Sequence, residues 1–452
     1  MLLPAHLANN MNTPICDFVK EYAKSDSIKL HMPGHKGKTF LGFENLDITE
    51  IDGADSLYEA NGIIAESEKN ASAIFACDTY YSTEGSSQCI RAMMYLISLY
   101  AKNKGEKPYV LAGRNAHKTF HSAIALLDID IDWIYPDNNE NYLSCNISAE
   151  NLSNIIKNGD RKPTAVYLTS PDYLGNVLDI AEISKVCREN GIILAVDNAH
   201  GAYLKFLEKS QHPIDLGVDI CCDSAHKTLP VLTGGAYLHV SDSFLQKTSS
   251  QVKNALALFG STSPSYLILQ SLDAANVYLE HFSEKLCSFV KNVNFLKKQL
   301  DKNGYELYGN EAIKITIQTK KYGYLGSDFA KILKEKGIVC EFCDPDFVVL
   351  MLTPEIDEID RIAKILCEIP KKEAINVKMP RFNKPEKRIS IREAILSSSV
   401  SLPVEQCVGR IVAMTSVGCP PAVPIAVAGE VIDEKALECF EYYGIKKCNV
   451  IE

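Results

Sequence analysis

The segment Ser224-Ala225-His226-Lys227-Thr228 follows an apolar stretch, residues 216–222, that has the length of a strand. A lysine beside a histidine and close to hydroxyl residues at such a position is typical of a lysine that forms a Schiff base with pyridoxal phosphate (PLP). In isolation, however, a lysine in this pattern is more often a solvated charge on a surface loop. Its interpretation therefore depends on the surrounding sequence.

Upstream, residues 192–201 read IILAVDNAHG, an apolar run that ends in Asp197. Open α/β sheets present ligand-binding groups at the carboxyl ends of their strands. A carboxylate there would keep the pyridine nitrogen of PLP protonated, so that the ring withdraws electrons from the substrate. The alternative role of Asp197 is to cap a turn.

Two further motifs fit the same cofactor. Thr83-Glu84-Gly85-Ser86-Ser87 opens a stretch with helical periodicity, and the free N–H groups and hydroxyls of such a helix start bind phosphate, although a plain helix cap has the same pattern. His117 follows the strand-like residues 109–112 within RNAHKT. Its ring could stack on a cofactor, or it could be a structural histidine.

The order of the motifs resembles the ornithine/lysine/arginine decarboxylase family of fold type I PLP enzymes over nearly the whole chain. The matching segments are HMPGHKG (31–37), DITE (47–50), DGADSL (52–57), TEGSS (83–87), RNAHKT (114–119), SPDYLGNVLDI (170–180), VDNAHGAYL (196–204), SAHKTLP (224–230), STSPSY (261–266) and CPPAVPI (419–425). The resemblance implies a large PLP-binding α/β domain with a mostly parallel sheet flanked by helices, and smaller α/β C-terminal parts.

The family implies a decarboxylase that acts on arginine, lysine or ornithine and releases carbon dioxide and a di- or polyamine. It also implies a homodimer or higher oligomer with shared active sites. By this resemblance, Lys227 forms the Schiff base, Asp197 pairs with the ring nitrogen, Ala199 packs beneath the ring and His117 above it. His226 would donate a proton after carbon dioxide leaves. The phosphate would be bound by Gly85, Ser86, Ser87, Ser224 and His226, with Thr262 or Ser263 from the other subunit.

A basic substrate needs a carboxylate at the far end of its pocket. Asp55, Glu84 and Glu430 lie in family-like segments and are the candidates, although each could be a surface charge or a cap. The chain also departs from the family pattern. Gly234 and Gly235 stand where a polar residue is usual, which predicts a smaller or looser wall near the phosphate; Asn198 follows the ring-binding aspartate; and Ala428 precedes Gly429-Glu430 in place of proline.

Aminotransferases and C–S or β-eliminating lyases use the same fold and the same cofactor motifs. HMPGHKG and the proline-rich segment favour the decarboxylase. A PLP-binding homologue without catalysis is disfavoured because Lys227, Asp197 and His117 are all present.

The composition fits this interpretation. The chain has 452 residues and a net charge of −10, which argues against a nucleic-acid partner. Neither a signal peptide nor a membrane-spanning stretch is found in the sequence, which predicts a cytoplasmic enzyme acting on a small molecule. The 15 cysteines are scattered, and Pro33-Gly34 separates His31 from His35, so no metal site is expected.

The pattern of apolar segments predicts an N-terminal arm (1–64), a large domain with a linking helix (65–300), a small α/β domain (301–383) and a C-terminal segment or lid (384–452). Strands are expected at 109–112, 131–135, 165–169, 192–196, 220–222 and 235–240, and one helical stretch at 265–300. In the small domain, strands are expected at 312–317 and 347–352 and helices at 327–336 and 358–367.

Overall fold

The computed structural model describes residues 11–137, 141–248, 251–380, 384–414 and 423–452. The family-like residues 419–422 lie outside this part of the chain. The chain divides into two compact units: the first contains residues 1–106 and 193–285, and the second residues 107–192 and 286–452. Among the described residues, no helix is both long and apolar enough to cross a membrane.

The described part of the first unit contains four strands in the order β1-β7-β6-β5. β5 and β6 are parallel, whereas β7 is antiparallel to both β6 and β1. The bounds are β1 Asp78–Ser82, β5 Ile193–Asp197, β6 Ile220–Asp223 and β7 Ala236–Val240. β5, β6 and β7 are buried along their whole length, so apolar side chains occupy both faces and explain the continuous apolar runs in the sequence.

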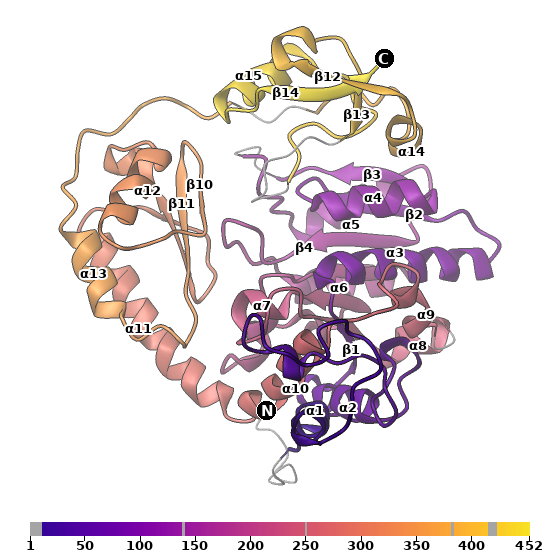
Figure 1. Cartoon of the computed structure of the whole chain (residues 1–452). Coiled ribbons are helices and arrows are strands. Elements are labelled where there is room, and N and C mark those ends of the chain that lie inside the picture. Colours follow the sequence, from indigo (N-terminus) through magenta and orange to yellow (C-terminus); the bar gives the residue numbers. More distant parts are fainter. Residues whose placement is uncertain (1–10, 138–140, 249–250, 381–383, 415–422) are drawn as a thin grey trace. The chain divides into compact units, whose positions relative to one another are not determined.

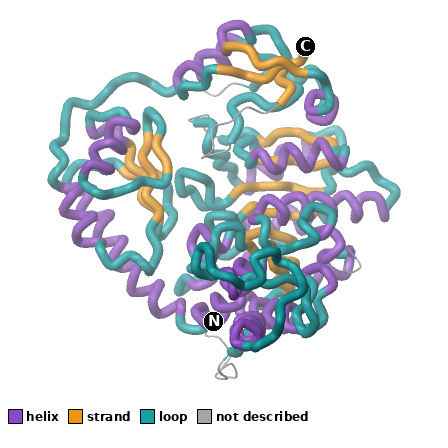
Figure 2. The backbone as a smooth tube through the Cα atoms, in the orientation of Figure 1, coloured by secondary structure: helices purple, strands orange, loops and turns teal. Residues whose placement is uncertain are grey.

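The helices of the first unit are α1 Pro14–Lys24, α2 Ile63–Phe75, α3 Gly85–Asn103, α7 Ala225–Thr228, α8 Asp242–Thr248, α9 Val252–Ala257 and α10 Tyr266–Leu279, with 3-10 turns at Glu44–Leu46, Leu57–Glu59, Ala202–Phe206 and Pro213–Leu216. α3 packs against β7 and β6. Between α1 and α2 the chain runs mostly as loop (Figure 2). This long connection contains the HMPGHKG motif.

Within its described residues, the second unit has three parallel strands in the order β4-β2-β3, with helices between them in sequence (Figure 1). Their bounds are β2 Tyr109–Gly113, β3 Asp130–Ile134, β4 Ala165–Thr169, α4 Lys118–Leu127, α5 Ala149–Asn158 and α6 Ile180–Glu189. Helix α11, Phe282–Lys302, begins at the end of the first unit and continues into the second.

Two smaller antiparallel sheets complete the second unit. One has the order β10-β11-β9-β8, and α12 packs against it. The other has the order β12-β14-β13. The bounds are β8 Leu307–Tyr308, β9 Lys314–Gln318, α12 Gly326–Glu335, β10 Phe342–Cys343, β11 Phe347–Met351, α13 Ile359–Cys367, α14 Ile391–Ile395, β12 Ser399–Pro403, β13 Val412–Met414, α15 Glu434–Tyr442 and β14 Lys447–Ile451, with 3-10 turns at Thr319–Tyr322 and Val404–Gln406.

The secondary structure follows the sequence-based predictions closely. β2 to β7 each lie within one residue of the strand expected for them. The parallel pairs β5–β6, β2–β3 and β2–β4 confirm a mostly parallel α/β fold. Strand β1 was not predicted, and the single expected helix at 265–300 is two helices, α10 and α11. No glycine or proline marks that break, so local sequence could not reveal it.

Candidate active site

Lys227 lies in α7, the short helix that follows β6, and its Nζ is 3.0 Å from Nε2 of His200. His200 comes three residues after the end of β5. β5 and β6 are adjacent and parallel, with Asp197 in register with Cys222, so both loops leave the same edge of the sheet. Sequence reasoning quoted His200 within DNAHG but gave it no role; the signal was its place just beyond a strand end.

Asp197 is the last residue of β5, and only 2% of its surface is exposed. Its Oδ1 accepts a hydrogen bond from the backbone N–H of Ala199 at 3.1 Å. Ala199 is also buried. A carboxylate in such a low-dielectric site interacts strongly with a facing cation, which suits it to a protonated pyridine nitrogen.

The serines expected at the phosphate are brought together from two elements. α3 begins at Gly85, so Ser86 and Ser87 belong to its first turn, where backbone N–H groups have no partner within the helix. Ser224 donates a hydrogen bond from its Oγ to Oγ of Ser86 at 2.7 Å. Hydroxyls and a helix N-terminus therefore lie in one place, as anion binding requires.

The glycine pair near this helix start does not loosen the structure, in contrast to what the sequence suggested. Gly85 donates its backbone N–H to the carbonyl of Gly234 at 2.7 Å. Gly234 has φ +98°, and a Cβ there would lie 3.0 Å from the carbonyl oxygen of Thr83. A Cβ on Gly235 would approach Val231 to 2.3 Å. The wall is thus closely packed. Of the two expectations, a smaller or a looser wall, the looser one was wrong, because the absence of side chains lets the backbone approach closely.

His226 is half-buried, and its Nδ1 lies 3.0 Å from the carbonyl oxygen of Gly235. Burial lowers the pKa of His226, and the positive charge of Lys227 lowers it further, while the Gly235 carbonyl opposes the shift. A neutral imidazole is therefore favoured beside the lysine. Thr262 and Ser263 are exposed on the first unit.

His117 belongs to the second unit, where it is the N-cap residue of α4. Its Nδ1 accepts the backbone N–H of Thr119 at 3.2 Å and lies 3.0 Å from Oγ1 of the same threonine. These contacts fix the orientation of the ring, which a stacking role would need.

The three candidate substrate carboxylates differ in their surroundings. Asp55 is buried and accepts backbone N–H groups of Ser56, Asn61, Gly62, Ile64 and Ala65. Glu430 is buried in the second unit, where it pairs with Arg114 at 2.9 Å. Glu84 is exposed and accepts the backbone N–H of Ser261. Asp55 is thus bound to the backbone of its own loop, which agrees with its capping alternative, and Glu430 is paired with a buried arginine.

The groups gathered in the first unit match the parts of PLP. An amine, a buried carboxylate and a hydroxyl-lined helix start are what an aldehyde, a pyridine nitrogen and a phosphate respectively require. In addition, Oγ1 of Thr228, next to Lys227, is buried without a hydrogen-bond partner among the described residues. The residues present therefore fit this cofactor.

Solved structures with the same architecture define the class of fold. A lysine decarboxylase, LdcF, from Francisella novicida superposes with a TM-score of 0.78 at 16% identity, covering 97% of this chain and 81% of that one. The constitutive lysine decarboxylase of E. coli gives a TM-score of 0.75 at 17% identity, covering 98% and 82%. The protein thus has the fold of fold type I PLP-dependent enzymes.

The sequence comparisons identify the family. Residues 13–319 match the family described as Orn/Lys/Arg decarboxylase, major domain. An arginine decarboxylase of Bacillus subtilis (strain 168) is 27% identical over 462 residues, covering 94% of this chain and 92% of that protein. The lysine decarboxylase LdcA of Pseudomonas aeruginosa is 23% identical, covering 63% of this chain and 43% of that protein. The chain belongs to the Orn/Lys/Arg decarboxylase family, as the motifs predicted.

Proposed function

We propose that this protein is a PLP-dependent decarboxylase of a basic amino acid, either arginine, lysine or ornithine, and that its products are carbon dioxide and a di- or polyamine. The observation that carries the proposal is the contact between Lys227 and His200 next to the buried carboxylate of Asp197, in a chain of this family. Relatives named arginine decarboxylase and lysine decarboxylase support a basic substrate.

In this proposal Lys227 holds the aldehyde carbon of PLP, and Asp197 holds the ring nitrogen. The bound cofactor supplies an electron-withdrawing ring that stabilises the negative charge left on Cα when the carboxylate departs. Ser86, Ser87 and Ser224 bind the phosphate together with the first N–H groups of α3. Ala199 would pack against the ring, and the stacking role of His117 stays what the family resemblance implies.

We assign the proton transfers of the reaction to His226 and Lys227. The lowered pKa of His226 keeps its imidazole neutral near pH 7, able to exchange a proton with a neighbouring group. We assign His226 a proton relay: its neutral imidazole takes up a proton at Nε2 from a neighbouring group or from water, and then delivers that proton to Cα after decarboxylation. His200 positions the Lys227 amine through the contact between their side-chain nitrogens.

Of the carboxylates considered for the substrate side chain, Glu84 is the one we propose, because it precedes the helix start that carries Ser86 and is exposed. The many backbone donors around Asp55, and the ion pair of Glu430, argue against those two. Thr262 and Ser263 would reach the site of a partner subunit in a homodimer. A cytoplasmic location belongs to the same proposal.

The test is to incubate the purified protein and PLP with arginine, lysine, ornithine and several neutral and acidic amino acids, and to follow carbon dioxide together with product masses. We expect release from one basic amino acid and loss of that release in Lys227→Ala. Keto-acid or ammonia formation without carbon dioxide would instead assign an aminotransferase or a lyase. PLP binding without any turnover would point to a non-catalytic homologue.

A further inference from the structure

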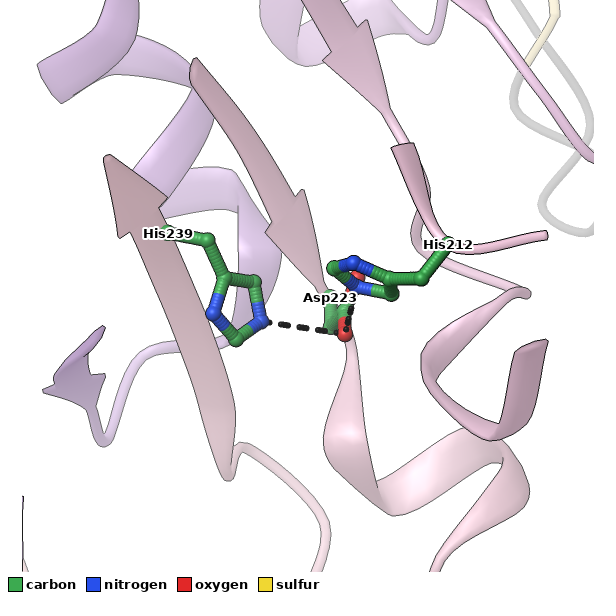
Figure 3. Close-up of side chains that lie close together, drawn as sticks. All are labelled: His212, Asp223 and His239. Carbon is green, nitrogen blue, oxygen red and sulfur yellow. Dashed lines mark hydrogen bonds and ion pairs between the residues drawn. The ribbon is translucent and has the colours of Figure 1, made fainter. Parts of the chain in front are cut away.

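At the carboxyl end of β6, directly before α7, three ionisable side chains form a fully buried cluster. His212 and His239 each place Nε2 3.1 Å from the same oxygen, Oδ2 of Asp223 (Figure 3). Asp223 is the last residue of β6, His239 lies in β7, and His212 precedes a 3-10 turn. All three side chains have 0% exposure. Phe75 lies against both imidazoles. Its ring centroid is 4.4 Å from that of His239 and 5.6 Å from that of His212.

The other oxygen of Asp223 connects this cluster to the loop that follows β5, which contains Asn198, Ala199 and His200. Asn198 donates a hydrogen bond from Nδ2 to Oδ1 of Asp223 at 2.6 Å. Asn198 is also fully buried, and it lies between Asp197 and Ala199 in the chain. The carboxylate thus accepts three side-chain donors, one of which belongs to the loop that carries the proposed ring-binding residues.

The hydrogen-bond pattern defines the protonation of the cluster. Burial alone would raise the pKa of Asp223, but the two imidazoles lower it below its ordinary value. Burial would likewise lower the pKa of His239, but Asp223 raises it. Nδ1 of His239 lies 3.0 Å from Oγ1 of Thr79, which in turn donates to the carbonyl of Cys77 at 3.2 Å, so a protonated His239 has acceptors on both nitrogens.

His212 differs from His239 in one respect that also bears on metal binding. No described residue hydrogen-bonds its Nδ1. A metal at Nε2 would force the proton onto Nδ1 and leave a buried donor without an acceptor, which is costly. In the alternative tautomer, Nε2 of His212 carries the proton and donates it to Asp223. The atom left without a partner is then Nδ1, which is an acceptor and not a donor. The cluster is therefore better satisfied as a hydrogen-bonded ion pair than as a metal site.

We propose that Asp223, held by His212 and His239, is a positioning residue that fixes Asn198 and thereby the loop carrying Asp197 and His200 for cofactor binding. This inference rests on the proposed function. It accounts for the asparagine at position 198, where the family resemblance implies an acidic or a small residue: an acidic side chain there would face the carboxylate of Asp223, and a small one could not donate a hydrogen bond to it. The cluster also holds the carboxyl end of β6 directly before Ser224.

The experiment compares the dissociation constant of PLP, measured from the visible absorbance of the bound cofactor, in the wild type, Asp223→Asn and Asn198→Ala. Loss of a hydrogen bond to a charged group predicts PLP binding weakened by about tenfold in both variants. The matched control is Asp273→Asn. Asp273 is a buried carboxylate of the same unit that accepts from Ser67 at 2.6 Å and from the backbone of Cys16 at 2.9 Å. Its PLP dissociation constant should equal that of the wild type.

A second pair of variants tests the role of the imidazole. In His212→Gln the amide nitrogen can still donate to Asp223, so PLP affinity should stay within about threefold of the wild type, whereas His212→Leu should weaken binding by about tenfold. Asn198→Ala leaves the ion pair in place, so it also serves if Asp223→Asn fails to fold.

The outcomes separate this inference from the proposed function. If the wild type binds no PLP, the proposed function fails. If the wild type binds PLP and both Asn198→Ala and His212→Leu bind it equally well, the positioning role is refuted and the proposed function stands. One metal ion per chain in the purified holoenzyme, lost in His212→Leu, would also overturn the inference.

Discussion

The side-chain nitrogens of Lys227 and His200 lie 3.0 Å apart, although the two residues follow different strands of the sheet. We expect His200→Ala to lower kcat/KM by about tenfold, because one hydrogen bond that orients the reactive amine is lost. His200→Gln, which keeps a polar nitrogen at this position, should recover part of the loss. Steady-state kinetics and the visible spectrum of bound PLP provide the measurement. Equal kinetics in His200→Ala and the wild type would remove His200 from the site.

Gly234 tests how closely the backbone is packed at the proposed phosphate site. Gly234→Ala should lower the free energy of unfolding by about 2–3 kcal/mol, because a left-handed φ is costly for alanine and the new Cβ would press on the Thr83 carbonyl. Gly105→Ala is the control: its φ is +75°, but nothing lies within 4 Å of the added Cβ. That variant should lose about 1 kcal/mol. Denaturant unfolding measures both, and equal losses would show that the close contact is unimportant.

The ion pair between Arg114 and Glu430 should contribute to stability and not to substrate binding. Both side chains are almost fully buried, and burial raises the pKa of Glu430 against the opposing charge of Arg114. Glu430→Gln leaves the guanidinium without its carboxylate, so we expect a loss of about 3 kcal/mol in the free energy of unfolding.

Glu386 is the control for this variant, because its ion pair with Arg388 is exposed. Glu386→Gln should leave stability nearly unchanged. An increase in KM for the basic substrate in Glu430→Gln, without loss of stability, would instead make Glu430 the substrate carboxylate.

Asp344 should make stability depend on pH. Burial is the main cause that raises the pKa of Asp344 from its ordinary 3.8 to about 7, with the nearby charge of Asp346 adding to it and backbone N–H groups opposing it. Between these values the folded chain holds a proton that the unfolded chain has released. This proton therefore stabilises the fold at low pH, and its contribution falls by up to about 1.4 kcal/mol per pH unit from pH ~4 to pH ~7.

Asp344→Asn removes this titration. Unfolding free energies measured from pH 4.5 to pH 8 should show a shallower decrease for the variant than for the wild type. Asp328→Asn, in the exposed part of α12, should keep the wild-type slope. Parallel curves for the wild type and Asp344→Asn would contradict the raised pKa.

Much of this protein could be read from local sequence. The apolar runs before Asp197 and Ser224 predicted strands β5 and β6, because burial on both faces requires continuous apolar residues. The glycine and serines at 85–87 predicted the start of a helix, and α3 begins at Gly85. The ordered motifs were sufficient to predict the family.

Other features depended on pairings between residues that are distant in sequence. Three contacts each join side chains from separate strands or loops. They are the contact of His200 with Lys227, the ion pair of Glu430 with Arg114, and the carboxylate of Asp223 that two histidines share. A carboxylate has the same local sequence signal whether it binds substrate, caps a helix or pairs with a buried cation. Only the fold decides which of these occurs, because the cost of burying a charge is met by whichever partner the packing brings near.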